Sequence, residues 1–311
     1  MIIAYGEILV DTFRYHNRTD AFVGGAPFNV CYAIQKMGKD ALFVGSIGDD
    51  AYGHMIEDFF AKNHIENKGL RVDAKRPTAY SEVTLKNNDR SFTFHRDDAA
   101  DDVFMEESLD FIPQADIVHL GSLMLSSERG RDFFHKVISA AHSQHKPVSF
   151  DINFREDIFS DLPTALHIYK DILPEIDILK FSKEEIALFY NTKNIPEALE
   201  IYRGTNKLVL VTDSRNGSYA HVGDHLFHAD TIKVNAIDPT GAGDAFYGAF
   251  LSQVDSFGLS AISHIPSLLT SSLRFGNIAG ALSTTKKGAL SAIPSYRDVV
   301  AAIEGEPYQG R

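Results

Sequence analysis

The stretch Asp238-Pro-Thr-Gly-Ala-Gly-Asp244 places an acid beside three small residues at the predicted start of a helix. The backbone N–H groups of Gly241, Ala242 and Gly243 would point along the positive end of the helix dipole, where anions such as phosphate bind. An acid would repel such an anion unless it accepts a proton from a hydroxyl that attacks the phosphorus. The stretch therefore predicts an anion site with Asp244 as a base. The alternative is that Asp244 only complements the helix dipole.

A second stretch, Phe22-Val-Gly-Gly-Ala-Pro-Phe-Asn-Val-Cys31, offers a backbone that a ligand can approach closely. Gly24 and Gly25 have no side chains to obstruct the approach, and the amide of Asn29 can both donate and accept hydrogen bonds at the start of the next helix. Such groups suit the hydroxyls of a sugar. Taken alone, the two glycines also fit a plain loop and helix cap.

Both stretches belong to a chain in which short apolar runs alternate with amphipathic segments. The apolar runs cover 2–10, 41–47, 117–121, 147–152, 178–181 and 208–212, and helices are predicted over 29–37, 52–63, 126–145, 241–254 and 268–287. This alternation is typical of βαβ units, and continuously apolar strands indicate helices on both faces of the sheet. The prediction is an α/β fold with a doubly wound, mostly parallel sheet.

One region lacks this alternation of apolar runs and amphipathic segments. Residues 78–85 and 91–95 alternate apolar and polar side chains on either side of Asn87-Asn88-Asp89. This pattern predicts a β-hairpin with one solvent-exposed face. Together with residues 12–23 this hairpin would form a small β-sheet lid, made of about 12–23 and 78–96. No internal repeat and no Pro/Gly-rich linker divides the chain, so residues 1–311 are expected to form one domain that carries the lid.

The composition excludes several classes of partner. The 311 residues are 44% apolar and 23% charged, as in globular proteins, and 42 acidic against 30 basic residues give a net charge of -12. This charge repels nucleic-acid phosphate and anionic lipid, and no 18-residue apolar stretch or signal peptide occurs. A single cysteine, Cys31, cannot form an intrachain disulfide. These features favour a cytoplasmic protein that binds neither nucleic acid nor a membrane.

With both stretches in this order, the chain resembles the ribokinase-like (PfkB) family of sugar and nucleoside kinases from Gly6 to about Pro294. The two family signatures read Gly24-Gly25-Ala-Pro-Phe-Asn29 and Asp238-Pro-Thr-Gly-Ala-Gly-Asp244. The first signature and the strand Phe92-Thr-Phe-His-Arg96 look most like fructokinases. The resemblance implies the ribokinase-like fold and transfer of the γ-phosphoryl group of ATP to a hexose hydroxyl, with fructose as the expected sugar.

The resemblance also implies roles for residues at matching positions. Asp244 would be the catalytic base, with Gly241, Ala242 and Gly243 as the anion hole. The substrate-binding positions are Asp11, Gly25, Asn29, Phe94, Arg96 and Arg155. The nucleotide-side positions are Lys180, Ser182, Thr212, Gly217, Asn277 and Ala281. Glu185 would hold Mg²⁺ through water, and Asp238, with the carbonyls near Ala289, would hold a monovalent cation such as K⁺.

Three positions depart from the family pattern. Ser182 stands where many members have Asn, Ser214 replaces the usual glycine of a T-x-G loop, and Cys31 stands where Ala or Ser is usual. Ser182 keeps a hydroxyl but has less reach than an amide, which affects the water-mediated Mg²⁺ site. Ser214 would narrow or shift the nucleotide loop. Cys31 is a small apolar residue and should be harmless.

Other activities remain compatible with the same sequence. A 2-keto-3-deoxygluconate kinase, a ribokinase or a nucleoside kinase would share the scaffold. A catalytically silent sugar-binding sensor is the alternative from another class, and the presence of Asp244 argues against it. The exposed β-sheet of the lid could also pair with the lid of a second copy of the chain, so a homodimer through the lid is expected.

Overall fold

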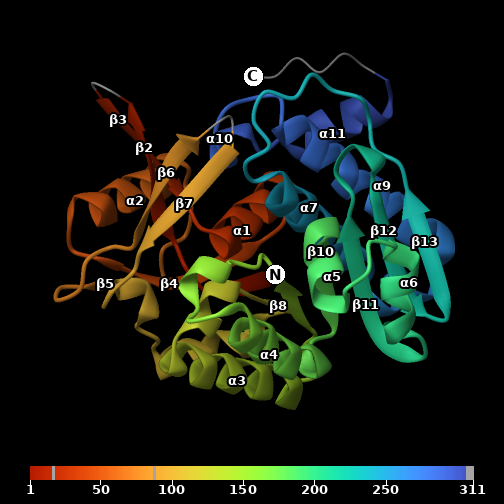
Figure 1. Cartoon of the computed structure of the whole chain (residues 1–311), viewed down its shortest axis with the longest axis horizontal. Coiled ribbons are helices and arrows are strands. Elements are labelled where there is room, and N and C mark those ends of the chain that lie inside the picture. Colours follow the sequence, from red (N-terminus) through yellow and green to blue (C-terminus); the bar gives the residue numbers. More distant parts are fainter. Residues whose placement is uncertain (16–17, 87–88, 306–311) are drawn as a thin grey trace.

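Two β-sheets organise the chain, which a computed structural model describes over residues 1–15, 18–86 and 89–305 (Figure 1). The strands of the main sheet are β1 (Ile2–Tyr5), β4 (Ala41–Gly48), β5 (Leu70–Asp73), β8 (Ile117–Leu120), β9 (Val148–Asp151), β10 (Ile178–Ser182), β11 (Thr205–Thr212), β12 (Ser218–Gly223) and β13 (His225–Ala229). They lie in the order β13-β12-β11-β10-β9-β8-β1-β4-β5. The small sheet has the order β3-β2-β6-β7 and consists of β2 (Leu9–Tyr15), β3 (Arg18–Gly24), β6 (Tyr80–Lys86) and β7 (Asp89–His95).

Most neighbours in the main sheet run parallel. Strands β5, β4, β1, β8, β9, β10 and β11 form a parallel series, whereas β12 and β13 add an antiparallel edge. The central strands β1, β8 and β9 are buried throughout, as expected for a sheet with both faces covered. The predicted doubly wound, mostly parallel sheet is therefore confirmed.

Helices cover both faces of the main sheet. One face packs against α3 (Glu128–Ser143), α4 (Leu162–Ile172), α5 (Lys183–Tyr190) and α6 (Ile195–Leu199). The other face packs against α1 (Ala26–Lys36), α7 (Ala242–Phe257), α8 (Leu259–His264) and α9 (Pro266–Ser283). Helix α2 (Ala51–Lys62) packs beside β4, and α10 (Ala289–Ala292) and α11 (Tyr296–Ile303) follow α9 along the chain. No helix within the described parts of the chain is long and apolar enough to cross a membrane.

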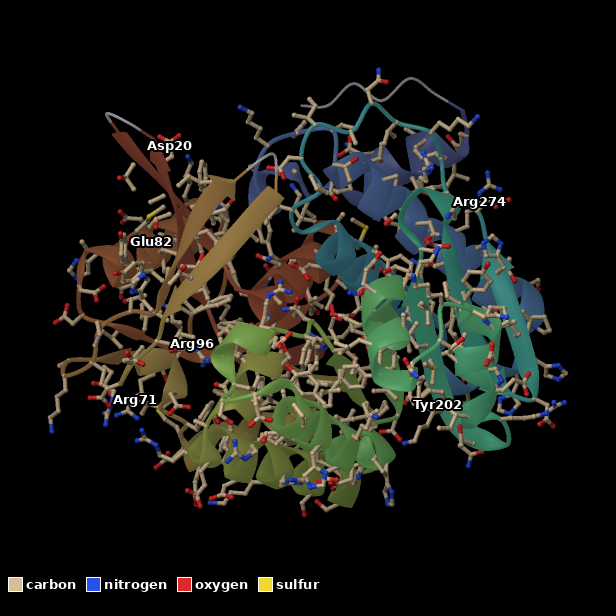
Figure 2. The ribbon with its side chains drawn as sticks, viewed as in Figure 1. Asp20, Arg71, Glu82, Arg96, Tyr202 and Arg274 are labelled. Atoms are coloured by element: carbon tan, nitrogen blue, oxygen red, sulfur yellow. The ribbon has the colours of Figure 1, made fainter. Side chains whose placement is uncertain are left out.

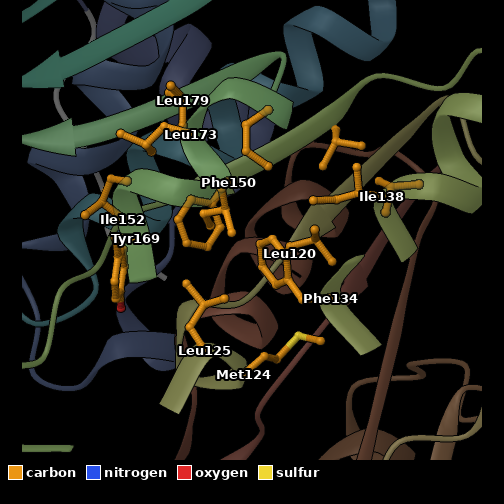
Figure 3. Close-up of a cluster of buried hydrophobic side chains, with 14 of the residues drawn as sticks. Leu120, Met124, Leu125, Phe134, Ile138, Phe150, Ile152, Tyr169, Leu173 and Leu179 are labelled. Atoms are coloured by element: carbon orange, nitrogen blue, oxygen red, sulfur yellow. The ribbon is translucent and has the colours of Figure 1, made fainter. Parts of the chain in front are cut away.

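An aromatic layer holds the central strands against α3 and α4 (Figure 3). Phe150 of β9 packs edge-on against Phe134 of α3, with ring centroids 5.4 Å apart, and against Tyr169 of α4 at 6.0 Å. Leu120 of β8 and Leu179 of β10 belong to the same cluster. Since burial of each such side chain contributes about 1.5–3 kcal/mol, the layer keeps the carboxyl ends of these strands in fixed positions.

The sequence pattern predicts one apolar segment over residues 2–10, but the structure divides this segment between two strands. Strand β1 ends at Tyr5, and β2 begins at Leu9 in the other sheet. Gly6, between them, has φ +149°, and a Cβ there would lie 2.7 Å from Cγ of Pro27. Only a glycine allows this close approach, so the chain leaves the main sheet at Gly6 and enters the small one.

Two helix boundaries also differ from the predicted ones. Helix α1 begins at Ala26 rather than at 29, because Pro27 has a backbone φ preset for the first helical turn. Residues 122–126 form a separate 3-10 turn, and α3 begins only at Glu128, after Ser127 accepts a hydrogen bond from a first-turn N–H.

The small sheet joins two hairpins that are distant in the sequence. Strands β2 and β3 are antiparallel, as are β6 and β7, and the parallel pair β2–β6 links them. A separate small sheet is therefore present, as predicted. The predicted turn at Asn87-Asn88 lies outside the described residues.

Candidate active site

A pocket lies where the carboxyl ends of β1, β8 and β9 approach the small sheet and the start of α7. This is the position at which parallel α/β sheets usually bind ligands. The predicted residues that line it are Asp11, Gly25, Asn29, Phe94, Arg155, Gly241 and Asp244, with Ala289 beside them. Residues that the sequence did not predict also contribute to the wall: Glu7, Leu9, Ala26, Leu123, Asn153 and Thr240.

Asp244 lies in the first turn of α7 and is held by Asn29 at the start of α1. The side-chain Nδ2 of Asn29 donates to Oδ2 of Asp244 at 2.7 Å. Burial raises the pKa of the Asp244 carboxyl, while Lys180, the hydrogen bond from Asn29 and Arg155 act in the opposite direction. The other amide atom of Asn29, Oδ1, is buried without a hydrogen-bond partner among the residues that the structure describes. It can therefore accept a hydrogen bond from a ligand hydroxyl.

Helix α7 begins with the predicted anion-binding turn. Gly241 has φ +75°, a left-handed conformation that favours glycine, and a Cβ there would lie 2.9 Å from Cβ of Ala289. The N–H of Ala242 donates to the carbonyl of Pro239 at 3.2 Å, so the predicted anion-binding role of Ala242 would require this bond to be shared or broken. Gly243 follows in the first turn, at the positive end of a 16-residue helix.

The sugar-side acid Asp11 comes from β2 of the small sheet. Ser81 of β6 donates to its Oδ1. Burial raises the pKa of the Asp11 carboxyl, while the Ser81 hydrogen bond and Arg155 lower it. The two glycines of the first signature are needed for space: a Cβ on Gly24 would lie 2.7 Å from Oδ2 of Asp11, and one on Gly25 would lie 2.6 Å from the carbonyl oxygen of Glu7.

Arg96 does not line this pocket, although it was predicted as a substrate-binding residue. It lies at the end of β7, where Figure 2 labels it, and its Nε donates to Oδ2 of Asp101 at 2.7 Å. One of its terminal nitrogens donates to Oγ of Ser126 at 2.9 Å. Arg96 lines a neighbouring hollow with Phe94 and Ile158 instead.

Glu7 is a pocket residue that the sequence analysis missed. Burial raises the pKa of its carboxyl to about 8, and Arg96 only partly opposes that rise. Its Oε2 has no hydrogen-bond partner within the described parts of the chain. The available signal was an acid directly after the buried strand β1, but a single acid at a strand end does not reveal its surroundings.

Lys180 lies below the anion-binding turn rather than on an exposed nucleotide surface. Its Nζ, from the middle of β10, donates to Oδ1 and Oδ2 of Asp151 at 2.9 and 2.8 Å, and Asp151 is the last residue of the neighbouring strand β9. Asp151 was also missed by the sequence analysis. Burial raises the pKa of its carboxyl, and Lys180 opposes that rise.

Glu185 is fixed by backbone N–H groups on both sides. Its Oε2 accepts from N–H of Ser182 at 2.6 Å, its Oε1 accepts from N–H of Phe154 at 2.8 Å, and the hydroxyl of Ser182 accepts from N–H of Glu185 at 3.2 Å. Each carboxylate oxygen keeps a second lone pair that can bind water. This geometry fits an acid that reaches Mg²⁺ through water, as the family position of Glu185 implies, because Mg²⁺ keeps several of its waters.

The remaining predicted residues surround the loops after β11 and β13. Thr212 ends β11, and Gly217 has φ +88°, in a turn where a Cβ would lie 2.0 Å from the carbonyl oxygen of Ala229. Asn277 of α9 donates to that same carbonyl at 2.8 Å, so its side chain holds the loop after β13. Ala281 lies one turn further along α9.

Asp238 joins two loops at the start of the second signature. Its Oδ1 accepts from N–H and Oγ1 of Thr240 at 3.0 and 2.7 Å, and its Oδ2 accepts from N–H of Gly288 at 3.1 Å. This arrangement positions the turn before α7 relative to the turn before α10.

The sequence matches the model of one known protein family over most of its length. The family model of the pfkB family carbohydrate kinases matches residues 2–295. The chain belongs to this family. It is therefore a carbohydrate kinase, and the predicted resemblance is confirmed.

Proteins with similar sequences or structures include several fructokinases. A probable fructokinase-2 from Arabidopsis thaliana is 33% identical over 308 residues, covering 95% of this chain and 93% of that protein. Fructokinase-2 from Oryza sativa subsp. japonica is 35% identical over 308 residues, covering 95% and 91%. Among solved structures, the fructokinase from Xylella fastidiosa with bound ATP has a TM-score of 0.89 at 29% identity, covering 98% of both chains. The Vibrio cholerae O395 fructokinase with fructose, ADP and calcium ion has a TM-score of 0.86 at 27% identity, covering 96% and 97%.

Proposed function

We propose that this carbohydrate kinase is a fructokinase, which transfers the γ-phosphoryl group of ATP to a hydroxyl of fructose. The observation that carries the proposal is the contact between Asn29 and Asp244 at the start of α7, because it aims a buried acid into a pocket next to a helix N-terminus. The similar plant proteins named fructokinase, and the similar structures with ATP or with fructose and ADP, support this choice of substrates.

The pocket residues divide the reaction between them. Asp11, Asn29 and Arg155 would orient the sugar, with Oδ1 of Asn29 accepting from one hydroxyl. Asp244 accepts the proton of the attacking hydroxyl while the new oxygen–phosphorus bond forms. The bond between the γ-phosphorus and the bridging oxygen breaks, and ADP leaves. The N–H groups of Gly241 and Gly243, and that of Ala242 if it also leaves Pro239, would stabilise the charge on the transferred group.

The metal-side residues fit the same assignment. Glu185 would hold Mg²⁺ through water, and bound Mg²⁺ neutralises phosphate charge. Within the described residues no three or more His, Cys, Asp or Glu side chains form a metal-binding group. Mg²⁺ held by one carboxylate, water and substrate phosphates does not need such a group. The turn fixed by Asp238 is the proposed place of a monovalent cation such as K⁺, which would order the start of α7.

The test is an ADP-release assay with ATP, Mg²⁺ and one of six acceptors: fructose, glucose, mannose, ribose, 2-keto-3-deoxygluconate or adenosine. We expect the highest kcat/KM with fructose. Asp244→Asn should lower kcat by about 10²- to 10⁴-fold, the usual contribution of a general base. Asp58→Asn, the same change on the exposed side of α2, is the matched control and should keep its activity. Preference for another acceptor overturns the fructose assignment, and an Asp244→Asn variant with more than half of the wild-type kcat overturns the base.

The small sheet is also the proposed contact between two copies of the chain. Its edge strands are β3 and β7, and Phe22 of β3 is 44% exposed beside Phe13, with ring centroids 5.6 Å apart. An exposed strand edge with aromatic side chains favours pairing with another sheet. Sedimentation velocity should show a dimer that Phe22→Lys weakens and Ile201→Lys, on a remote exposed residue, does not. A monomeric wild type at micromolar concentration would contradict this contact.

A further inference from the structure

A buried ion pair lies directly behind the anion-binding turn. Lys180, in the middle of β10, is the register partner of Asp151, the last residue of β9, and both are nearly inaccessible, at 5% and 3% exposure. Their contact is bidentate, with Nζ at 2.8 and 2.9 Å from the two carboxylate oxygens. A buried pair costs free energy to desolvate, and it seldom increases stability relative to apolar residues of the same size. Its position is therefore better explained by the site than by stability.

Gly243 gives the ammonium group access to the site. A Cβ at this position would lie 3.0 Å from Nζ and 3.8 Å from Cε of Lys180. Gly243 lies within the regular part of α7, so space, and not an unusual backbone conformation, is what a side chain would lack. The absence of a side chain thus lets Nζ approach the first turn of α7, whose residues Gly241 and Asp244 line the pocket.

The charges around this ammonium group are mostly negative. The acids that interact with it are Asp151 of β9, Glu185 of α5 and Asp244 of α7. Arg155 is the other cation that acts on Asp244. His119 of β8 and Tyr247 of α7 also lie in this buried region, and both are neutral there because burial and Lys180 lower the pKa of His119 to about 3, and burial raises that of Tyr247.

Loss of the ammonium group would therefore leave Asp244 and Glu185 with little compensation. Lys180 is the strongest influence that keeps the pKa of Asp244 from rising further on burial. The same positive charge lies next to Gly243, in the helix turn where the transferred phosphoryl group is proposed to bind. At a water-excluded site such a fixed charge acts more strongly than in solvent.

We infer that Lys180, held by Asp151 and admitted by the missing side chain of Gly243, is a positioning residue that supplies fixed positive charge to the phosphoryl site and to Asp244. This inference rests on the proposed kinase reaction and extends it to residues inside the fold. Asp151 has the role of fixing the lysine rotamer. Gly243 is required for the approach of Nζ as well as for the anion-binding N–H group.

The test compares three variants. Lys180→Met alone would leave Asp151 as an unpaired buried charge, so the informative change is Lys180→Met with Asp151→Asn, which keeps the shapes and removes both charges. Gly243→Ala leaves the pair intact and pushes Nζ away from the helix turn. Lys207→Met is the matched control, because Lys207 lies on β11 far from the pocket and donates to the carbonyls of Pro174 and Ile176.

Two readouts are measured with the full-length protein. The first is the affinity for ATP with Mg²⁺ by calorimetry without sugar, which should fall at least fivefold in the double variant and in Gly243→Ala. The second is the pH profile of kcat/KM, whose acid limb should move to higher pH in the double variant. Lys180 is the largest influence that lowers the pKa of Asp244, so its loss outweighs the loss of the repulsion from Asp151. Lys207→Met should match wild type in both.

An unchanged ATP affinity or an unchanged acid limb in the double variant overturns the inference, even where kcat falls. The calorimetric readout needs no sugar. A wild type that releases no ADP with any of the six acceptors contradicts the proposed function, and the ATP affinities then still decide the role of Lys180. A thermal unfolding curve of each variant shows that the fold is intact.

Discussion

Ser214 holds the loop after β11 in a left-handed backbone conformation, with φ +48°. It follows Asp213, whose N–H donates to the carbonyl of Gly217 at 2.8 Å, and its own carbonyl accepts from N–H of Gly217 at 3.2 Å. A residue with a Cβ in this conformation costs about 1–2 kcal/mol relative to the right-handed one. The turn thus explains why glycine is usual at this family position.

We predict that Ser214→Gly increases the free energy of unfolding by up to about 1 kcal/mol. Relief of the left-handed conformation exceeds the extra backbone entropy that a glycine loses on folding. Urea unfolding at neutral pH measures the difference. Gly217→Ala is the opposite control and should destabilise the protein, because its Cβ would lie 2.0 Å from the carbonyl oxygen of Ala229. A Ser214→Gly variant that is less stable than wild type would show that the serine side chain stabilises the loop.

At this scale the sequence predicts residues that belong to contiguous motifs. Asp244 and Asn29 could be named because each lies in a short stretch whose residue types already suggest the chemistry. Asp151 and Glu7 could not, because each is a single acid after an apolar strand, and its meaning depends on Lys180 or Arg96, which are distant in the sequence. Arg96 shows the converse: its family position suggested the sugar, whereas its guanidinium contacts Asp101.

Among the described residues, two helices begin with the same reciprocal cap, and only one of these helices lies at the site. Helix α5 begins with Ser182 and Glu185, and α11 begins with Ser295 and Asp298. In both, the serine hydroxyl accepts from the N–H of the acid, and the acid accepts from the N–H of the serine. The cap alone therefore explains the position of Glu185, and a metal-related role must be separated from it.

We predict that Glu185→Gln raises the Mg²⁺ concentration for half-maximal rate at least severalfold, whereas Asp298→Asn leaves it unchanged. Gln at position 185 can still accept the cap hydrogen bond from Ser182 but has no second oxygen for the N–H of Phe154, so this variant should lose about 1–3 kcal/mol of stability. Asn at position 298 keeps the cap and should lose no more than about 1 kcal/mol. The negative charge that attracts hydrated Mg²⁺ is lost only at the site. Magnesium titrations at fixed ATP and sugar concentrations measure the effect. If the Glu185→Gln titration overlays that of wild type, Glu185 is only a helix cap.

The elements themselves were predictable where periodicity is strong. The parallel strands and the long helices α7 and α9 follow from apolar runs and helical patterns. The division of residues 2–10 between two sheets did not, because both halves are apolar and the break depends on the contact of Gly6 with Pro27. The antiparallel edge of β12 and β13 was not predicted either, since its half-exposed pattern is weak.

At the scale of the whole molecule, several carboxyl groups are buried around one pocket. Glu7, Asp11 and Asp244 all have a raised pKa, and in each case burial is the largest cause. These acids come from the connection after β1, the small sheet and α7, so folding brings them together in a chain that already has a net charge of -12. Because burial disfavours the charged form of each acid, ionisation of any of them lowers the free energy of unfolding. The protein is therefore expected to lose stability as the pH rises through their folded-state pKa values.

Glu7 allows this expectation to be tested with one substitution. Its pKa is about 4.5 when unperturbed and about 8 in the folded protein. Between these values the unfolded chain has released the proton and the folded chain keeps it, so stability falls as the pH rises from about 5 to 8 and levels off above.

Glu7→Gln removes this ionisation. The stability difference between variant and wild type should therefore shift in favour of the variant by roughly 2–4 kcal/mol from pH 5 to pH 8, since one pKa unit corresponds to 1.36 kcal/mol. Urea unfolding at four pH values measures the shift, with Glu57→Gln on the exposed side of α2 as the control. Most of the contribution of the other buried acids is common to wild type and variant, and only the part that comes from their repulsion of Glu7 remains in the difference. Parallel stability curves for Glu7→Gln and wild type would mean that Glu7 is ionised in the folded protein and paired with Arg96.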